Sequence, residues 1–205
     1  MSRRRASLIG NCRGGGAAEF ALVLPLLLIL LFGVIDGGRF AWEYNRAEKA
    51  TQVGARMAVV TDVISTGLRD NTYVGMSFGG PALKGGDVIP TAALGTITCT
   101  STACSCSGAC SGITNGRNGT AFTNLVNRMK QIKPDIGAAN VRVLYRGSGL
   151  GYAGDPNGME LSPLVTVELT GLQFRPITTL MLATVAMPSF STTLTAEDSV
   201  GSVSN

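Results

Sequence analysis

One feature constrains this chain most: an uncharged apolar run near the N-terminus, at residues 20–35, which reads FALVLPLLLILLFGVI. As an α-helix it spans about 24 Å, and the small residues before it bring the length close to the roughly 30 Å of a hydrocarbon core. Four arginines precede the run, at positions 3, 4, 5 and 13, and Asp36 closes it. Because basic residues stay in the cytoplasm, we expect one span with a cytoplasmic N-terminus and everything after Asp36 across the membrane.

Charge and composition outside this run exclude several functional classes. Histidine is absent from the 205 residues, which excludes a Ser-His-Asp triad, a Cys-His pair and every histidine-ligated metal site. The formal net charge is +4, and the four leading arginines account for it, so no basic surface for nucleic acid is expected. No nucleophile has a recognisable activating base. We therefore expect a protein that is not an enzyme, holds no metal or cofactor, and binds no nucleic acid.

The apolar run has three interpretations. A secretory signal peptide needs small residues at a cleavage site after the run, yet Val34, Ile35 and Asp36 stand there. A plain signal anchor needs only the run and the arginines. Neither explains Glu19, because a carboxylate at the edge of a span costs up to ~3 kcal/mol and so usually has a partner. The third interpretation accounts for this residue.

A short motif before the run carries that third interpretation. Gly14 is followed by four residues and then by Glu19 and Phe20. The pattern resembles the class III signal of type IV pilins in its Flp-type branch, where a prepilin peptidase cuts on the cytoplasmic side of the apolar run. The resemblance implies cleavage after Gly14, which makes Gly15 the new N-terminus and keeps the run as an anchor. The Gly15 ammonium can then pair with the Glu19 carboxylate of a neighbouring subunit inside the bilayer, where an isolated charge is costly.

The longer stretch at residues 14–60 resembles the TadE-like family of minor pilins (pseudopilins) of the Tad/Flp pilus system. The shared features are Ala-Glu-Phe-Ala before the run, Pro25 inside it, Gly38-Arg39 after it, and the cluster Gly54-Ala55-Arg56. The resemblance implies a single-pass minor pilin in the inner (cytoplasmic) membrane, with its C-terminal domain extracytoplasmic and association with the pilus as a further expectation.

The same resemblance implies a set of partners. These are the prepilin peptidase, the major Flp pilin, other minor pilins, the inner-membrane Tad assembly platform and membrane lipid. The alternative function is a signal-anchored extracytoplasmic domain that binds a ligand or envelope component and is not incorporated in a pilus. Such an anchor would need neither Gly14 nor Glu19, so these two residues discriminate between the two hypotheses.

Beyond the span, the pattern predicts a longer helix and then an α+β domain. Aromatic and small residues recur at alternating spacings of four and three: Phe40, Tyr44, Ala47, Thr51, Gly54 and Ala58. We expect strands at 72–78, 95–99, 141–146, 163–169 and 190–195, and a helix at 121–133. The predicted fold is α+β, with a prepilin leader at 1–14, a transmembrane and extended helix at 15–61, and an extracytoplasmic domain at 62–205 whose sheet packs on that helix.

Four cysteines fall within twelve residues, at Cys99, Cys104, Cys106 and Cys110. In an oxidising compartment this spacing predicts two disulfides that close a short loop. Three pairings are possible, and Cys104 with Cys106 is the least favourable because one intervening residue strains the geometry. A tetrathiolate zinc site is the competing interpretation, but the spacing lacks two CxxC knuckles. The fifth thiol, Cys12, would leave with the leader.

Two further patterns share one loop. Residues 149–154 match GxGxxG, but a turn follows where a dinucleotide site needs a helix, so a loop is expected. Asp155, Asn157 and Glu160 offer calcium-type oxygen ligands, although the full twelve-residue loop pattern is missing. Neither pattern changes the expected function.

Overall fold

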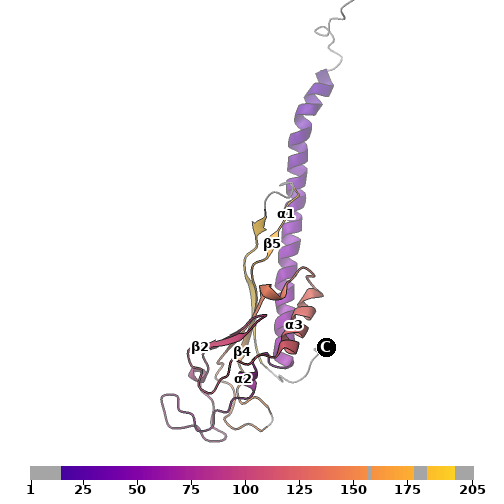
Figure 1. The fold of residues 1–205 in the computed structure, drawn as a ribbon. Helices are drawn as coiled ribbons and strands as arrows, with labels where there is room; N and C mark the ends of the chain where they lie inside the picture. The colour runs from indigo at the N-terminus through magenta and orange to yellow at the C-terminus, as the bar shows by residue number, and fades with distance from the viewer. Residues whose placement is uncertain (1–14, 157, 178–183, 197–205) are drawn as a thin grey trace, which may run out of the picture. The chain divides into compact units, whose positions relative to one another are not determined.

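The computed structural model of the protein describes residues 15–156, 158–177 and 184–196 (Figure 1). The predicted leader, with Gly14 and Cys12, lies outside these residues. The fold is α+β, as predicted. Its elements are α1 (Gly15–Val60), α2 (Thr66–Arg69), the 3₁₀ helix η3 (Thr91–Ala93), β1 (Thr96–Cys99), β2 (Cys104–Ser107), α3 (Gly119–Lys130), the 3₁₀ helix η4 (Ala138–Asn140), β3 (Val141–Arg146), β4 (Leu164–Leu169), β5 (Gln173–Phe174), β6 (Val185–Ala186) and β7 (Phe190–Thr195).

The chain divides into two compact units, and α1 contributes to both. The first unit contains Met1–Trp42 and Phe174–Val185, and the second contains Glu43–Gln173 and Ala186–Asn205. α1 is 46 residues long and includes Pro25 without interruption. The small residues of the predicted stripe all lie in the second unit, and all four are buried, which confirms this part of the stripe. They are Ala47, Thr51, Gly54 and Ala58.

The second unit is built on a five-stranded antiparallel sheet in the order β2-β1-β3-β4-β7. Buried residues alternate with more exposed ones along β3 and β4. On the buried face Val143 lies opposite Val167, and on the other face Arg142 lies opposite Glu168. A sheet with one apolar face needs a cover on that face only, which α1 supplies.

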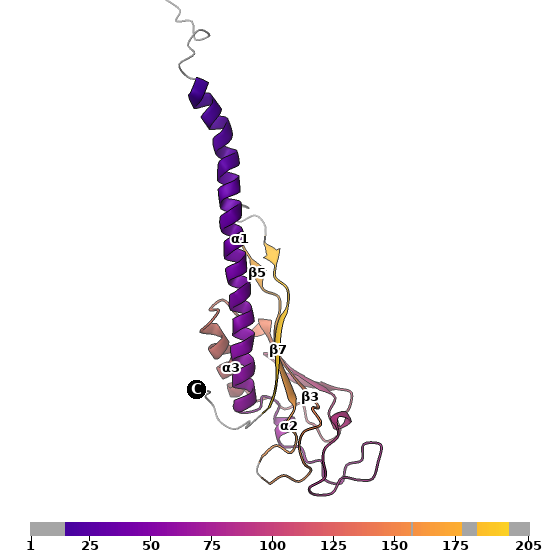
Figure 2. The ribbon, with the colours of Figure 1, turned by 180° about the vertical axis from the view of Figure 1, so that it is seen from behind.

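The second half of α1 lies between α3 and the sheet, as both views show (Figures 1 and 2). Gly54 permits this close approach, since a Cβ there would lie 3.0 Å from Met129 of α3 and 3.3 Å from Val167 of β4. At the sheet edge, the Tyr44 ring meets Phe190 of β7 edge-on, with centroids 4.8 Å apart. The predicted packing of the sheet on the long helix is therefore confirmed.

Most of the predicted elements are present. β1, β3, β4 and β7 match four of the predicted strands to within one residue. The predicted helix at 121–133 is α3, which begins after Asn118, whose side chain caps the N–H of Ala121. α3 ends at Lys130, ahead of Pro134, because proline cannot continue a helix.

The predicted strand at 72–78 is wrong. Gly75 has a φ of +84°, a backbone conformation that glycine adopts without steric cost. The Gly75 N–H donates to the carbonyl of Leu83 and the Leu83 N–H donates to that of Met76, so the chain turns back on itself. The N–H of Tyr73 donates to the Glu160 side chain instead of to a neighbouring strand.

Candidate functional site

The first half of α1 presents an apolar surface to its surroundings. An 18-residue window of this helix has a mean hydropathy of 2.6, and none of the window is buried within the described chain. Among the described residues, α1 is the one helix that is long and apolar enough to cross a membrane. The expected single-pass anchor is compatible with this arrangement.

Glu19 and Phe20 lie near the start of this helix. Glu19 is exposed, and Phe20 is 62% exposed. Gly15 is the first residue of α1 and lies four residues before Glu19, a spacing that puts both on one helix face, about 6 Å apart along the axis. Gly14, on the other side of the expected cleavage point, lies outside the described residues.

Where the apolar run ends, a segment from far along the sequence is held against α1. Asp36 is only 6% exposed, and its Oδ1 accepts hydrogen bonds from Arg39 Nη1 at 3.0 Å and from the N–H of Ile177 at 2.8 Å. The Phe174 ring meets Phe40 edge-on at 5.4 Å, and the Arg39 guanidinium lies 5.4 Å from the Phe174 centroid. We call these five residues the boundary clip.

A second polar cluster joins α1 to the end of α3 within the second unit. The Lys133 side chain is 2% exposed and pairs with Glu43 of α1 and, at 3.0 Å, with Asp135. Arg46 of α1 donates hydrogen bonds of 2.9 and 2.8 Å to the carbonyl of Ile132. A buried ammonium requires such partners, because an unpaired charge away from water is costly. This cluster therefore fixes α1 against α3.

The four clustered cysteines form two disulfides, Cys99–Cys104 and Cys106–Cys110. Cys99 lies opposite Cys104 in the register of β1 and β2, so the first bond crosslinks this hairpin. The second bond ties β2 to the turn that follows it. Within the described ranges, no group of three or more His, Cys, Asp or Glu residues is placed to hold a metal ion.

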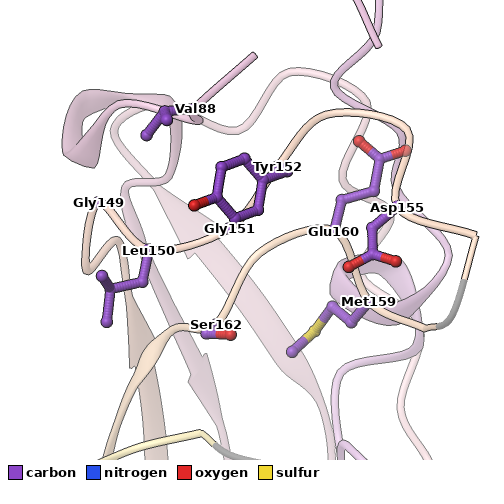
Figure 3. Close-up of a pocket in the computed structure, with 9 residues that line it drawn as sticks. All are labelled: Val88, Gly149, Leu150, Gly151, Tyr152, Asp155, Met159, Glu160 and Ser162. Atoms are coloured by element: carbon purple, nitrogen blue, oxygen red, sulfur yellow. The ribbon is translucent and has the colours of Figure 1, made fainter. Parts of the chain in front are cut away.

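A cavity of about 410 Å³ lies beside the loop between β3 and β4 (Figure 3). Gly149 and Gly151 of the GxGxxG pattern line it with φ values of +78° and +130°. No helix begins between β3 and β4 in the described residues, so the pattern forms a loop, as expected. A dinucleotide phosphate would lack the helix N-terminus that binds it in such sites.

The carboxylates at this cavity belong to Asp155 and Glu160, which Figure 3 shows on one side of it. Oε2 of Glu160 accepts a hydrogen bond of 2.8 Å from the N–H of Tyr73, and Glu160 is only 8% exposed. This carboxylate therefore holds the 72–78 segment in place. Asn157, the third residue of the calcium hypothesis, lies outside the described residues.

One known family shares the sequence of the N-terminal helix. Residues 14–56 match the TadE-like protein family. The match confirms the resemblance seen in the sequence and covers about a fifth of the chain, including Gly14, Gly15, Glu19 and Phe20. No curated protein and no solved structure matches the chain. The TadE-like segment and its apolar helix together indicate a membrane protein related to the Tad pilus.

Proposed function

We propose that this protein is a minor pilin, or pseudopilin, of the Tad (Flp, type IVb-like) pilus and that it acts in pilus assembly without catalysing a reaction. The observation that carries the proposal is the architecture of the TadE-like segment. The first part of α1 is an exposed apolar helix, and the last part is buried in the core of a folded domain. A subunit built in this way can insert into a membrane through the first part of α1 and carry its folded domain on the last part.

Glu19 is the residue on which assembly depends in this proposal. Cleavage after Gly14 by a prepilin peptidase leaves an ammonium on Gly15, four residues before Glu19. Each subunit then carries a positive and a negative group on one helix face, which is complementary to the corresponding face of a neighbour. Inside the bilayer, pairing between subunits offsets the cost of both charges.

The partners follow from the same proposal. They are the prepilin peptidase, the major Flp pilin, other minor pilins and the inner-membrane Tad assembly platform. The N-terminus lies in the cytoplasm and the second unit outside it, because the arginines that precede the apolar run favour that orientation. The protein needs no cofactor for this role.

The test compares Glu19→Ala and Glu19→Gln with the wild type. Both variants should insert as well as the wild type, because each removes a charge that is costly in the bilayer. Crosslinking to pilin partners and pilus production should fall about ten-fold or more, since breaking a buried pair costs roughly 3–5 kcal/mol and ten-fold is 1.4 kcal/mol. The readouts are membrane level, crosslinking yield and piliation.

Glu48→Gln is the matched control, because Glu48 is an exposed carboxylate on the same helix outside the apolar run. It should leave all three readouts unchanged. The intact mass of the membrane form should also show a chain that begins at Gly15. Normal crosslinking and piliation in both Glu19 variants, or retention of the leader in cells with active peptidase, would favour a signal-anchored binding domain instead.

A further inference from the structure

The boundary clip lies at the depth where the apolar span ends. Asp36 is the first charged residue after residues 20–35, and it follows Ile35 by a rise of about 1.5 Å along the helix. The N–H of Ile177 is 2.8 Å from Oδ1 of Asp36, so Ile177 lies at the level of this carboxylate. If the run spans the hydrocarbon core, then Ile177 lies at the boundary between acyl chains and headgroups.

The protein surface at this level is apolar on both sides of the contact. Ile177 is 48% exposed and Val185 is 45% exposed, while Val34 of α1 is 70% exposed and Ile35 is 42% exposed. The sequence has no charged residue at positions 176–185. Among the described residues here, Ile177 and Val185 therefore present exposed, uncharged apolar side chains.

The clip also gives Asp36 the partners that a carboxylate needs at this depth. An unpaired carboxylate near the hydrocarbon core is costly. The Ile177 N–H and the Arg39 guanidinium both donate to it, and it is nearly inaccessible to water. Arg39 of the clip also lies 3.5 Å from the carbonyl of Arg175, so two cationic side chains are close together here. Arginine side chains at this depth reach lipid headgroups while their stems stay in apolar surroundings.

We propose that the hairpin of β5 and β6, which pair as a two-stranded sheet, contacts the bilayer through residues 174–177 and Val185, a second lipid contact beside the span. Its partner is the phospholipid interface, with Ile177 toward the acyl chains and with Val185 and the two arginines at headgroup level. The contact fixes the level at which α1 leaves the bilayer. The inference requires that α1 spans a membrane and is independent of any role in pilus assembly.

Tryptophan quenching in proteoliposomes tests the contact. The chain has a single tryptophan, Trp42, so Trp42→Phe gives a background in which one new tryptophan reports its own surroundings. Ile177→Trp is the test variant. Val34→Trp is the control at the end of the span, and Tyr152→Trp, at a position that is 56% exposed in the second unit, is the control for an aqueous site.

We expect lipids brominated near the headgroup to quench Ile177→Trp at least half as strongly as Val34→Trp, with a blue-shifted emission, and to leave Tyr152→Trp unquenched. Quenching of Val34→Trp alone would overturn the lipid contact and leave the anchor intact. Absence of quenching at both positions would overturn the anchor and the contact together. Neither result would depend on piliation, so this test and that of the proposed function fail separately.

A measurement on the wild-type chain avoids any effect of substitution on folding. A lipid that carries a photoactivated diazirine at the upper part of its acyl chain should label residues 174–177, located by fragmentation of the labelled peptides, as well as residues 15–35. Peptides from residues 87–99 in the second unit serve as the comparison and should stay unlabelled. Labelling of residues 15–35 without labelling of residues 174–177 would overturn the proposal.

Discussion

The Tyr145 side chain joins the centre of the sheet to the chain segment that follows α1. Tyr145 is 1% exposed, and its hydroxyl oxygen accepts a hydrogen bond of 3.1 Å from the N–H of Ile64. Burial raises the pKa of Tyr145 far above its usual value, because the charged phenolate would lose its hydration. The phenol therefore stays neutral and serves as a fixed acceptor within the core.

Tyr145→Phe should lower the free energy of unfolding by about 1–3 kcal/mol, because the buried Ile64 N–H loses its partner. Urea denaturation of the solubilised protein measures this. Tyr152→Phe, at an exposed position, is the control and should change stability by less than about 0.5 kcal/mol. Folding favours the neutral phenol, so the contribution of Tyr145 to the free energy of unfolding is complete below about pH 10 and is lost at higher pH. Tyr145→Phe should remove this dependence on pH. Equal stability of the two variants would contradict this role.

At the scale of elements, the strands with one buried face could be predicted because apolar and polar residues alternate along them. β3 and β4 carry valine, tyrosine or leucine at every second, buried residue, so their period of two is visible without the fold. β2 reads Cys-Ser-Cys-Ser and has no such apolar signal, and its disulfide to Cys99 and its pairing with β1 define it instead. The 72–78 segment had the composition of a strand, but the turn at Gly75 prevents it.

The close approach of α1 to α3 and β4 should depend on the absence of a side chain at Gly54. Gly54→Val should lower the free energy of unfolding by about 1–3 kcal/mol, because the added methyl groups collide with Met129 and Val167. Gly38→Val is the matched control on the same helix, since a Cβ at Gly38 meets no atom within 4 Å. Thermal denaturation compares the stability of the two variants. An equal loss of stability in both would mean that helix propensity, and not packing at Gly54, determines the effect.

The polar clusters could not be predicted from sequence, because their members are far apart along the chain. Ile177 is 141 residues from Asp36, and Lys133 is 90 residues from Glu43. A local pattern reveals a span, a helix stripe or a pair of neighbouring cysteines. Only the fold shows that the first charge after the span, Asp36, receives an N–H donor from the hairpin. Gly14 and Glu19 could be predicted from the sequence, because the motif that contains both is only six residues long.

At the scale of the whole molecule, the second unit should fold without the apolar part of α1 but not without the rest of the helix. We expect a fragment of residues 43–205 to show a cooperative thermal transition, because it retains the buried stripe of α1 and the Lys133 pair. A fragment of residues 62–205 should show none, since the apolar face of the sheet loses its cover. Circular dichroism of both fragments measures this. A cooperative transition in the shorter fragment would show that the sheet does not need α1.

The strand order has a consequence for the time at which this protein can fold. Thr51 of α1 meets Thr192 of β7 with hydroxyl oxygens 3.0 Å apart, and β7 is the last strand in the described part of the chain. At about 5–20 residues per second, a ribosome completes β7 roughly 7–27 s after it completes α1. Until β7 is complete, Thr51 lacks its contact with Thr192, and the outer edge of β4 has no strand to pair with. Synthesis therefore completes the apolar run of α1 long before the second unit can close its sheet.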